Sequence, residues 1–534
     1  MKKVLIPLLI ALAVIIGFII GNTLTTRSLN VFDRMKISSE GKIDAILNII
    51  NTQYVDSVDP RELVEEAIPK ILSGLDPHSV YIPASDLQLV NEELESSFSG
   101  IGVQFNIQQD TVMIVGVISG GPSEKLGIMP GDRIVTVNDT LFTGKEMTNE
   151  KVMKKLRGPK GSTVRVGIKR SGVKELLPFT IVRGDIPVTS IDIAYKVTDQ
   201  IGYIKVSKFG SNTYNEFLSA LNRLQEEGAT KFIIDLRGNS GGYLDAAIQM
   251  INEFLQKDEL IVYTEGKSES RRNAYADGSG LFRENPLAVL IDEWSASASE
   301  IFAGAIQDND RGIIIGRRSF GKGLVQQQIP LRDGSAVRLT IARYYTPAGR
   351  DIQKPYKDES SYESDIMNRF LHGEFDTEDS IQVNKADSIE YKTLKEGRIV
   401  YGGGGIMPDI FVPRDTLGMT SYYNKVNNSG HLYEYAFQYA DQNRTKLKTF
   451  PDYRALENYL STQNLSESFA DFSAEKGVRR NPYLISKSRD LIENRLKAYI
   501  IRNIFGEEGF YPVFQQKDTT LKRAIQELSK GCDV

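Results

Sequence analysis

The sequence predicts a multidomain α/β protein. From Pro187 to Pro413, short apolar strands alternate with helices whose apolar residues recur every three to four positions, which is typical of a layered α/β core. Residues 96–185 instead contain short strands separated by turn signals such as Gly120-Gly121-Pro122, which predicts a β-rich domain. At about 150 residues per domain, a chain of 534 residues has room for three or so domains and their connections.

Composition and charge narrow the class of function. A net charge of −4 provides no basic surplus to neutralise phosphates, so we expect no nucleic acid as the main partner. The only cysteine, Cys532, excludes an intrachain disulfide. Three scattered histidines (His78, His372 and His431) and one cysteine form no cluster with recognisable metal-ligand spacing, so we expect neither a metal site nor another cofactor.

The amino terminus has the pattern of a membrane or export segment. Met1-Lys2-Lys3 precedes the uncharged apolar run Val4–Ile20, which is at the short end for a spanning helix, and the lysines favour a cytoplasmic amino terminus. A cleaved signal peptide is the alternative, although Gly21-Asn22-Thr23 is a poor cleavage site. Either way, we expect residues 1–22 to be a transmembrane anchor or signal segment. With an anchor, the rest of the chain is exported as a single-pass protein of the cell inner membrane with its catalytic domains in the periplasm. With a cleaved signal, it is exported and released.

Helical periodicity marks the two ends of the folded chain. We expect a helical N-terminal segment over residues 23–95 and a helical C-terminal extension over residues 415–534. In the C-terminal extension an amphipathic stripe is formed by Leu491, Ile492, Leu496, Tyr499, Ile500 and Ile504. Packing, oligomerisation or gating are the roles left open for this extension. His78 follows Asp76-Pro77 and is interpreted as a turn residue without a catalytic role.

The β-rich domain has strands and helices in a recognisable order. Its expected strands are Ile101–Ile107, Thr111–Ile118, Arg133–Val137, Thr163–Lys169 and Phe179–Val182, and its expected helices are Ser123–Gly127 and Asn149–Leu156. With the segment GIMPGDRIVTVND inside it, this order resembles a PDZ domain. The resemblance implies that a carboxy-terminal peptide adds as a strand to a sheet edge while backbone N–H groups hold its carboxylate. The loop for that carboxylate is formed by Gly100, Ile101, Gly102 and Val103.

The α/β core is expected over residues 186–414. Its predicted strands are Gly202–Ser207, Lys231–Leu236, Leu260–Thr264, Leu287–Ile291, Gly312–Gly316, Leu324–Leu331 and Ala336–Tyr345. The turn DLRGNSGG precedes a helix but has no following Gly-Lys-Ser/Thr, so we reject a phosphate-binding loop. Asp235, Arg237 and Glu300 are interpreted as residues that fix turns. The acid-rich residues 354–398 are expected to form a solvated insertion.

A run of serines lies between a strand and a helix. Ser295–Ser299 follows Leu287–Ile291 and opens a helix, so a hydroxyl there is exposed beside free backbone N–H groups, as an acyl-transfer nucleophile requires. Lys322 lies between two glycines among apolar residues, where desolvation favours the neutral amine that can accept a proton. In an extended strand Gln326 points to the same side and can hold that amine. The alternative is a simple helix cap and a solvated lysine.

The segments SASASEIFAGAIQDN and SFGKGLVQ resemble the catalytic core of the carboxy-terminal processing peptidases, also called tail-specific proteases. The resemblance covers residues 40–410. It implies a crotonase-like layered sheet with an inserted PDZ-like domain, Ser297 as nucleophile, Lys322 as base and Gln326 as its support. It also implies an oxyanion hole formed by the N–H of Ala298 and that of Gly241 or Gly242.

The resemblance leads to a functional hypothesis. We expect an exported serine endopeptidase that recognises the carboxy-terminal tails of protein or peptide substrates and cleaves through a Ser/Lys dyad. The alternative is a non-catalytic PDZ scaffold, or a periplasmic tail-binding chaperone, built on an inactive protease core. The physiological substrate, a homo-oligomer and an activating adaptor remain open.

Overall fold

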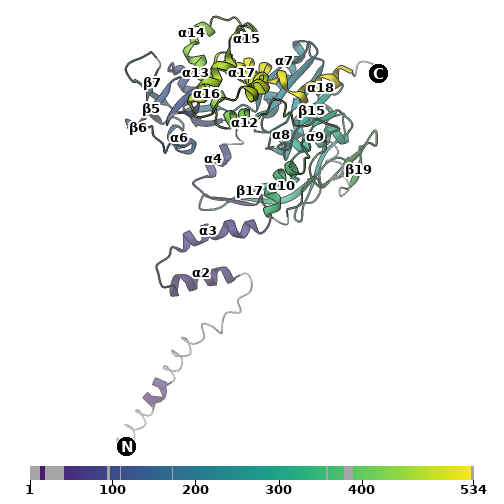
Figure 1. The fold of residues 1–534 in the computed structure, drawn as a ribbon. Coiled ribbons are helices and arrows are strands. Elements are labelled where there is room, and N and C mark those ends of the chain that lie inside the picture. The colour runs from purple at the N-terminus through teal and green to yellow at the C-terminus, as the bar shows by residue number, and fades with distance from the viewer. Residues whose placement is uncertain are drawn as a thin grey trace, which may run out of the picture. The chain divides into compact units, whose positions relative to one another are not determined.

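The computed structural model describes residues 12–18, 41–92, 95, 97–108, 110–118, 120–170, 172–356, 359–377 and 389–530 (Figure 1). The chain divides into two compact units, Met1–Leu75 and Asp76–Val534. The first unit contains the expected helices as α2 (Lys42–Gln53) and α3 (Pro60–Ser73). Most of the expected anchor or signal segment 1–22 lies outside the described residues. Within the described residues, no helix combines the length and apolar character needed to cross a bilayer.

The centre of the second unit is a six-stranded sheet. Its strand order is β10 (Ile191–Lys196), β11 (Ile201–Val206), β12 (Lys231–Asp235), β15 (Leu287–Ile291), β16 (Ile313–Gly316) and β21 (Ile410–Phe411). The β10–β11 pair is antiparallel and all other pairs are parallel. A parallel sheet requires helices on its faces, and the continuous apolar runs of β12 and β15 agree with that burial.

Helices cover both faces of this sheet. Alternate strand residues pack with α7 (Thr213–Glu226), α8 (Leu244–Asn252) and α9 (Ala298–Asp308) in the main core. The opposite strand residues pack with the last helix, α18 (Thr519–Lys530). The chain is therefore a layered α/β protein, as the sequence predicts. Its carboxy-terminal helix is one of the layers.

A second sheet lies beside the first. Its order is β1 (Val80–Ile82), β18 (Ala336–Tyr345), β13 (Leu260–Glu265) and β14 (Arg272–Tyr275), and β17 (Leu324–Pro330) also pairs with β18. The expected helical N-terminal segment extended to residue 95. Instead, residues from Asp76 onward belong to the second unit, and β1 is a strand of its sheet, followed by α4 (Leu87–Glu92).

The β-rich domain is inserted in the chain between α4 and β10. Its sheet has the order β3 (Val103–Gln108), β4 (Thr111–Val117), β5 (Arg133–Val137), β7 (Thr163–Lys169) and β8 (Leu177–Val182), with β6 (Thr140–Leu141) on β5. The short helices are α5 (Pro122–Lys125) and α6 (Asn149–Leu156). The entering strand β2 (Ser97–Gly100) pairs with the leaving strand β9 (Gly184–Pro187), so the two ends of the insertion are neighbours.

Residues 354–398 do not form the expected solvated insertion throughout. They contain α10 (Glu359–Leu371), β19 (Glu390–Lys392) and part of the β19–β20 pair, in which β20 is Ile399–Tyr401. Tyr362, Arg369 and Glu374 are buried. Arg369 and Arg318 both form ion pairs with Glu374. Glu374 therefore neutralises two arginines inside the protein, whereas the sequence predicts a solvated acidic residue. Residues 378–388 lie outside the described part.

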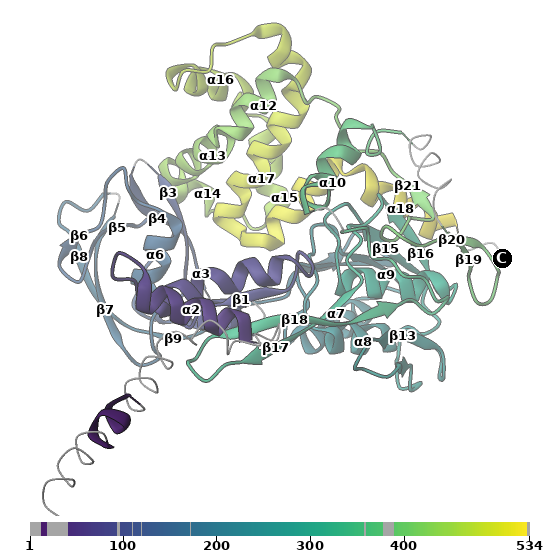
Figure 2. The ribbon, with the colours of Figure 1, turned by 90° about the horizontal axis from the view of Figure 1, so that it is seen from below.

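The C-terminal extension is helical, as expected. Helices α12 (Ser421–Asn428), α13 (His431–Gln442), α14 (Arg444–Leu447), α15 (Tyr453–Ser461), α16 (Leu465–Glu475) and α17 (Pro482–Phe514) share a core of their own. Figures 1 and 2 show them as a bundle beside the strands of the inserted domain. Helix α17 is interrupted at Gly506, where the backbone is not helical. After α17, the turn η2 (Gln515–Lys517) connects to α18, which contacts the central sheet.

Candidate active site

Ser297 occupies a strained position between β15 and α9. It is the N-cap residue of α9, with φ 56° and ψ −114°. A side-chain-bearing residue in such a conformation costs about 1–3 kcal/mol and persists only where surrounding contacts hold it. One such contact is the Ser297 N–H, which donates to Glu300 Oε2 at 2.8 Å. Ser297 is half-buried and lines a cavity of about 540 Å³, so its side chain has access to a bound molecule.

The other two serines of the run are structural. Ser295 Oγ donates to Leu236 O at 2.9 Å, and Ser299 Oγ donates to Asn239 O at 2.9 Å. Both side chains are fully buried and are not among the residues that line the cavity. They fasten the serine run to the neighbouring DLRGNSGG turn. Of the three serines, only Ser297 faces the cavity, which is the serine that the family resemblance selects.

Lys322 precedes strand β17 and is held by the predicted glutamine. Its Nζ donates to Gln326 Oε1 at 3.1 Å, and Gln326 Nε2 donates to the backbone carbonyl of His78. Burial lowers the pKa of Lys322 below its ordinary value, and the nearby positive charge of Arg338 adds to that effect, while Glu300 and Asp76 oppose it. The lysine is therefore shifted toward the neutral amine that a general base requires.

Two side chains tie the backbones of Ser297 and Lys322 together. Glu300 Oε2 accepts from the N–H groups of both residues, each at 2.8 Å. Tyr344 Oη donates to Ser297 O at 3.1 Å and also to Lys322 O. Ser297 and Lys322 line the same cavity, although in the described part of the chain no direct hydrogen bond joins Ser297 Oγ to Lys322 Nζ. Catalytic hydrogen bonds of this kind are often longer in the free enzyme than in the substrate complex.

Glu300 is a turn-fixing residue, as the sequence suggested. Its Oε1 accepts from Ser319 Oγ at 2.5 Å and from Gly321 N–H at 2.7 Å, in addition to the two bonds of Oε2. Burial raises the pKa of Glu300 to about 7, and these hydrogen bonds oppose the shift. Since four donors converge on two oxygens, the ionised carboxylate is the form that matches the site.

The DLRGNSGG turn and the first residue of α9 present unused N–H groups beside Ser297. Gly241 N–H donates to Asn239 Oδ1 at 2.9 Å, so it is already used. The N–H groups of Gly242 and Ala298, which line the cavity, donate to no acceptor in the described residues. The close approach also requires glycine, because a Cβ on Gly241 would lie 2.7 Å from Ser297 Cβ. Of the two glycines left open by the sequence, Gly242 has the available donor.

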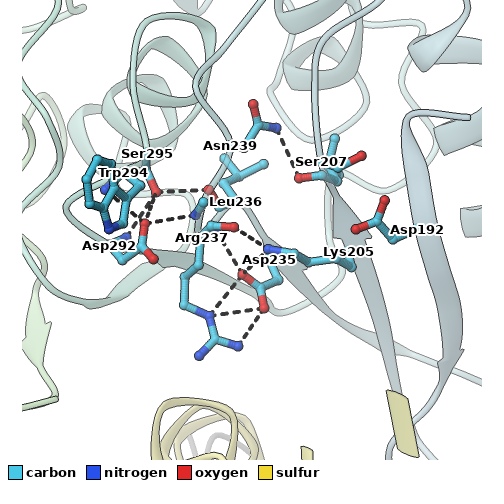
Figure 3. Close-up of polar contacts among 12 residues, drawn as sticks. Asp192, Lys205, Ser207, Asp235, Leu236, Arg237, Asn239, Asp292, Trp294 and Ser295 are labelled. Atoms are coloured by element: carbon cyan, nitrogen blue, oxygen red, sulfur yellow. Dashed lines mark hydrogen bonds and ion pairs between the residues drawn. The ribbon is translucent and has the colours of Figure 1, made fainter. Parts of the chain in front are cut away.

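A charged cluster fixes the start of this turn (Figure 3). Arg237 pairs with Asp235 at 2.6 Å, and Lys205 from the neighbouring strand points to the same carboxylate. Although burial opposes it, Arg237 and Lys205 hold the pKa of Asp235 below its usual range. Gly238 N–H donates to Asp292 Oδ1 at 2.9 Å. Asp235 and Arg237 thus shape the turn and do not line the cavity, in agreement with their interpretation as turn-fixing residues.

The predicted peptide loop lies at a free sheet edge. Gly100 ends β2 and Val103 begins β3, which is the edge strand of its sheet in the described structure. The carbonyls of Ile101 and Gly102 are used within the domain, by Ser123 and Ile118, while the N–H groups of Ile101 and Gly102 donate to no acceptor in the described residues. Gly102 has φ 76°, the conformation that favours glycine. Two donors and an unpaired strand edge are what strand addition requires.

Sequence reasoning missed two contributors to the site. Tyr344 reaches Ser297 and Lys322 from a different strand, and only the alternation of β18 hinted that its ring points inward. His78 contributes through its backbone carbonyl, which no side-chain motif reveals. Burial, with Lys322 nearby, lowers the pKa of His78 to about 4, so its imidazole is neutral at pH 7.

Three parts of the chain match models of known protein families. Residues 200–359 match the model of Peptidase family S41, residues 99–180 match that of the PDZ domain, and residues 422–506 match a family of unknown function (DUF8443). The solved photosystem II D1 C-terminal processing protease is 26% identical, with a TM-score of 0.37, over 71% of this chain and 95% of that one.

Two curated relatives cover much of the chain. Carboxy-terminal processing protease CtpB of Bacillus subtilis is 36% identical over 59% of this chain and 65% of that protein. The carboxy-terminal-processing protease of Bartonella bacilliformis is 38% identical over 58% of this chain and 71% of that protein. The chain therefore belongs to peptidase family S41, the carboxy-terminal processing serine proteases.

Proposed function

We propose that this chain is an endopeptidase that grips a substrate's carboxy-terminal tail and cleaves by a Ser297/Lys322 dyad. The observation that carries the proposal is the serine with a left-handed φ beside a half-buried lysine. Both line one cavity, and Glu300 and Tyr344 hold their backbones together. A perturbed lysine in a cavity with a strained serine is typical of a catalytic site.

The geometry supports an acyl-enzyme mechanism. Neutral Lys322 takes the proton of Ser297 Oγ, which forms a bond to the scissile carbonyl carbon. The N–H groups of Ala298 and Gly242 stabilise the resulting oxyanion. The C–N bond then breaks as the Lys322 ammonium returns its proton to the leaving amine. A water molecule attacks the acyl-enzyme with Lys322 again as base, which releases the acid and restores Ser297. Gln326 orients the Lys322 amine throughout.

The inserted domain supplies substrate selection. A tail added to the free edge of β3 would place its carboxylate at the N–H groups of Ile101 and Gly102, with Gly100 and Val103 framing the loop. Proteins or peptides with accessible carboxy-terminal tails are therefore the proposed substrates.

We also propose that the enzyme is exported and tethered. The support is the sequence pattern of Met1-Lys2-Lys3 followed by the apolar run Val4–Ile20. Fractionation of the native cell envelope, with alkaline extraction, separates a tethered from a released enzyme. Recovery of the full-length chain only in the cytosol would contradict export.

Digestion of β-casein tests the dyad. The wild type should cleave, while Ser297→Ala and Lys322→Ala should each lose most of the rate because the two residues act as a unit. Ser461→Ala and Lys425→Ala, on helices of the C-terminal bundle, are the matched controls and should cleave like the wild type. Equal cleavage by all five proteins would reject the dyad. Cleavage by none would favour the non-catalytic scaffold or chaperone.

A further inference from the structure

The chain returns to the protease core after its helical bundle. Leu521, Ala524 and Leu528 of α18 pack on the second face of the central sheet. Lys231 Nζ on β12 donates to Leu528 O at 2.7 Å, which fixes the end of the helix to the sheet. Asp518, the residue before α18, pairs with Arg237 of the DLRGNSGG turn.

Asp518 reaches that turn through Arg237. Arg237 Nη1 donates to Asp518 Oδ1 at 3.0 Å, and Arg237 Nη2 donates to Asp518 Oδ2 at 2.7 Å, a two-point pair. The Nε and Nη2 groups of the same guanidinium bind Asp235 (Figure 3). Asp518 also accepts from Leu521 N–H at 2.9 Å, so the residue that holds Arg237 is itself held by the first turn of α18.

Gln515 makes a second connection to the same cluster. Its Oε1 accepts from Tyr195 Oη at 2.6 Å, and its Nε2 donates to Tyr203 Oη at 2.6 Å. Tyr203 Oη in turn donates to Asp235 Oδ2 at 2.7 Å. Gln515, Tyr203 and Asp235 are buried, so an unmade hydrogen bond among these three side chains is costly. Two residues of the C-terminal segment therefore converge on Asp235 and Arg237.

Hydrogen bonds fix most of the turn between Arg237 and Gly242, whose N–H is unused. Gly238 is fixed by Asp292, and Asn239 O accepts from both Ala296 N–H and Ser299 Oγ. Gly241 is fixed by Asn239 Oδ1, and Gly242 follows with its unused donor. These bonds hold the turn from Arg237 to the donor beside Ser297.

We propose that Asp518 and Gln515 are positioning residues for catalysis: the C-terminal segment holds the 235–242 turn so that Gly242 N–H points at the oxyanion. This inference rests on the proposed dyad mechanism. It makes the docking of α18 a condition for full activity, and not only a contribution to stability. The segment lies beyond the part of the extension that matches a known family model.

The test compares Asp518→Ala and Asp518→Asn with Glu527→Gln in the full chain. Glu527 lies on the same helix and pairs with Arg523 at 2.8 Å, so it is the matched control. For each folded variant, kcat and KM are measured on a tailed peptide. Inhibition is also measured with a peptide aldehyde, which forms a tetrahedral adduct, and with the corresponding alcohol, which does not. Far-ultraviolet circular dichroism and melting temperature report folding.

Loss of one oxyanion donor costs roughly 100- to 1,000-fold in kcat, so a displaced donor in Asp518→Ala should cost about 10- to 100-fold. We expect KM to change less than about twofold, the aldehyde inhibition constant to rise in step with the loss in kcat, and the alcohol constant to stay unchanged. Asp518→Asn keeps a neutral acceptor and should show a smaller loss in the same direction. Glu527→Gln should match the wild type.

A lower melting temperature with unchanged kcat and unchanged aldehyde affinity would overturn the positioning role. If Asp518→Ala does not fold, the isosteric Asp518→Asn decides by the same criteria. Ser297→Ala separates the two hypotheses. If it is as active as the wild type, the dyad mechanism fails. If it is inactive while Asp518→Asn keeps the wild-type kcat and aldehyde affinity, only the positioning role fails.

Discussion

Replacing Tyr344 with Phe removes a single oxygen from a side chain that is only 1% exposed. The phenol donates to Ser297 O and Lys322 O, and burial raises its pKa well above the ordinary value, so it remains a donor. Ser297 O keeps two other donors, the N–H groups of Glu300 and Ile301. Lys322 O keeps none in the described residues. A buried carbonyl left without a partner costs about 1–3 kcal/mol, so we expect that loss in the free energy of unfolding.

The effect of Tyr344→Phe on kcat follows from the hydrogen bonds that join the Ser297 and Lys322 segments. Glu300 still holds the N–H groups of Ser297 and Lys322, so the two segments loosen but do not separate. Since a displacement of about 1 Å can cost about 100-fold in rate, we expect kcat to fall about tenfold.

Tyr345→Phe is the control for that substitution. Its ring stacks on Tyr263, with the centroids 4.8 Å apart, and the alternation of β18 turns it away from Tyr344. We expect Tyr345→Phe to keep the wild-type kcat. Steady-state kinetics on a tailed peptide and urea unfolding measure both effects. A Tyr344→Phe enzyme with wild-type kcat and wild-type unfolding would refute the argument that the phenol ties the two segments together.

Three further predictions concern the proposed base and its surroundings. Because the pKa of Lys322 is lowered, kcat/KM should rise with pH through a titration below about 10.4, and a flat profile from pH 6 to that value would count against it. Lys322→Met should abolish cleavage. Between the lowered pKa of Lys322 and its free value, the unfolded wild type binds more protons than the folded protein, so its free energy of unfolding rises with pH. Lys322→Met should remove this rise, which thermal melts at several pH values measure. Gln326→Glu should move the kcat/KM titration upward by about 1–3 pH units, because a carboxylate favours the ammonium form, and an unmoved midpoint would contradict the contact.

Much of the local structure could be predicted because local patterns determine it. The strand Leu287–Ile291 has the predicted bounds, and α9 begins directly after Ser297. Alternation on an extended chain was enough to bring Gln326 to Lys322. Both predictions depend on residues close in sequence, where chain geometry limits the alternatives.

Contacts between distant segments could not be predicted in this way. Val80–Ile82 pairs with β18, and such a short strand has no periodicity that separates it from a turn. Glu374 is charged and was assigned to solvent, but two buried arginines hold it. Asp518 is far in sequence from Arg237 and belongs to no motif. In each case a contact with a residue distant in sequence, and not the type of the residue itself, determines where the residue lies in the fold.

The pairing of β2 with β9 has a consequence for the evolution of the enzyme. Antiparallel partners lie about 5 Å apart, so the chain leaves the core and returns to it at almost the same point. Another domain with adjacent termini can therefore be grafted between Gly100 and Gly184 without rerouting the strands on either side. Such a fusion site lets the choice of target change by recombination while the cutting chemistry is inherited intact.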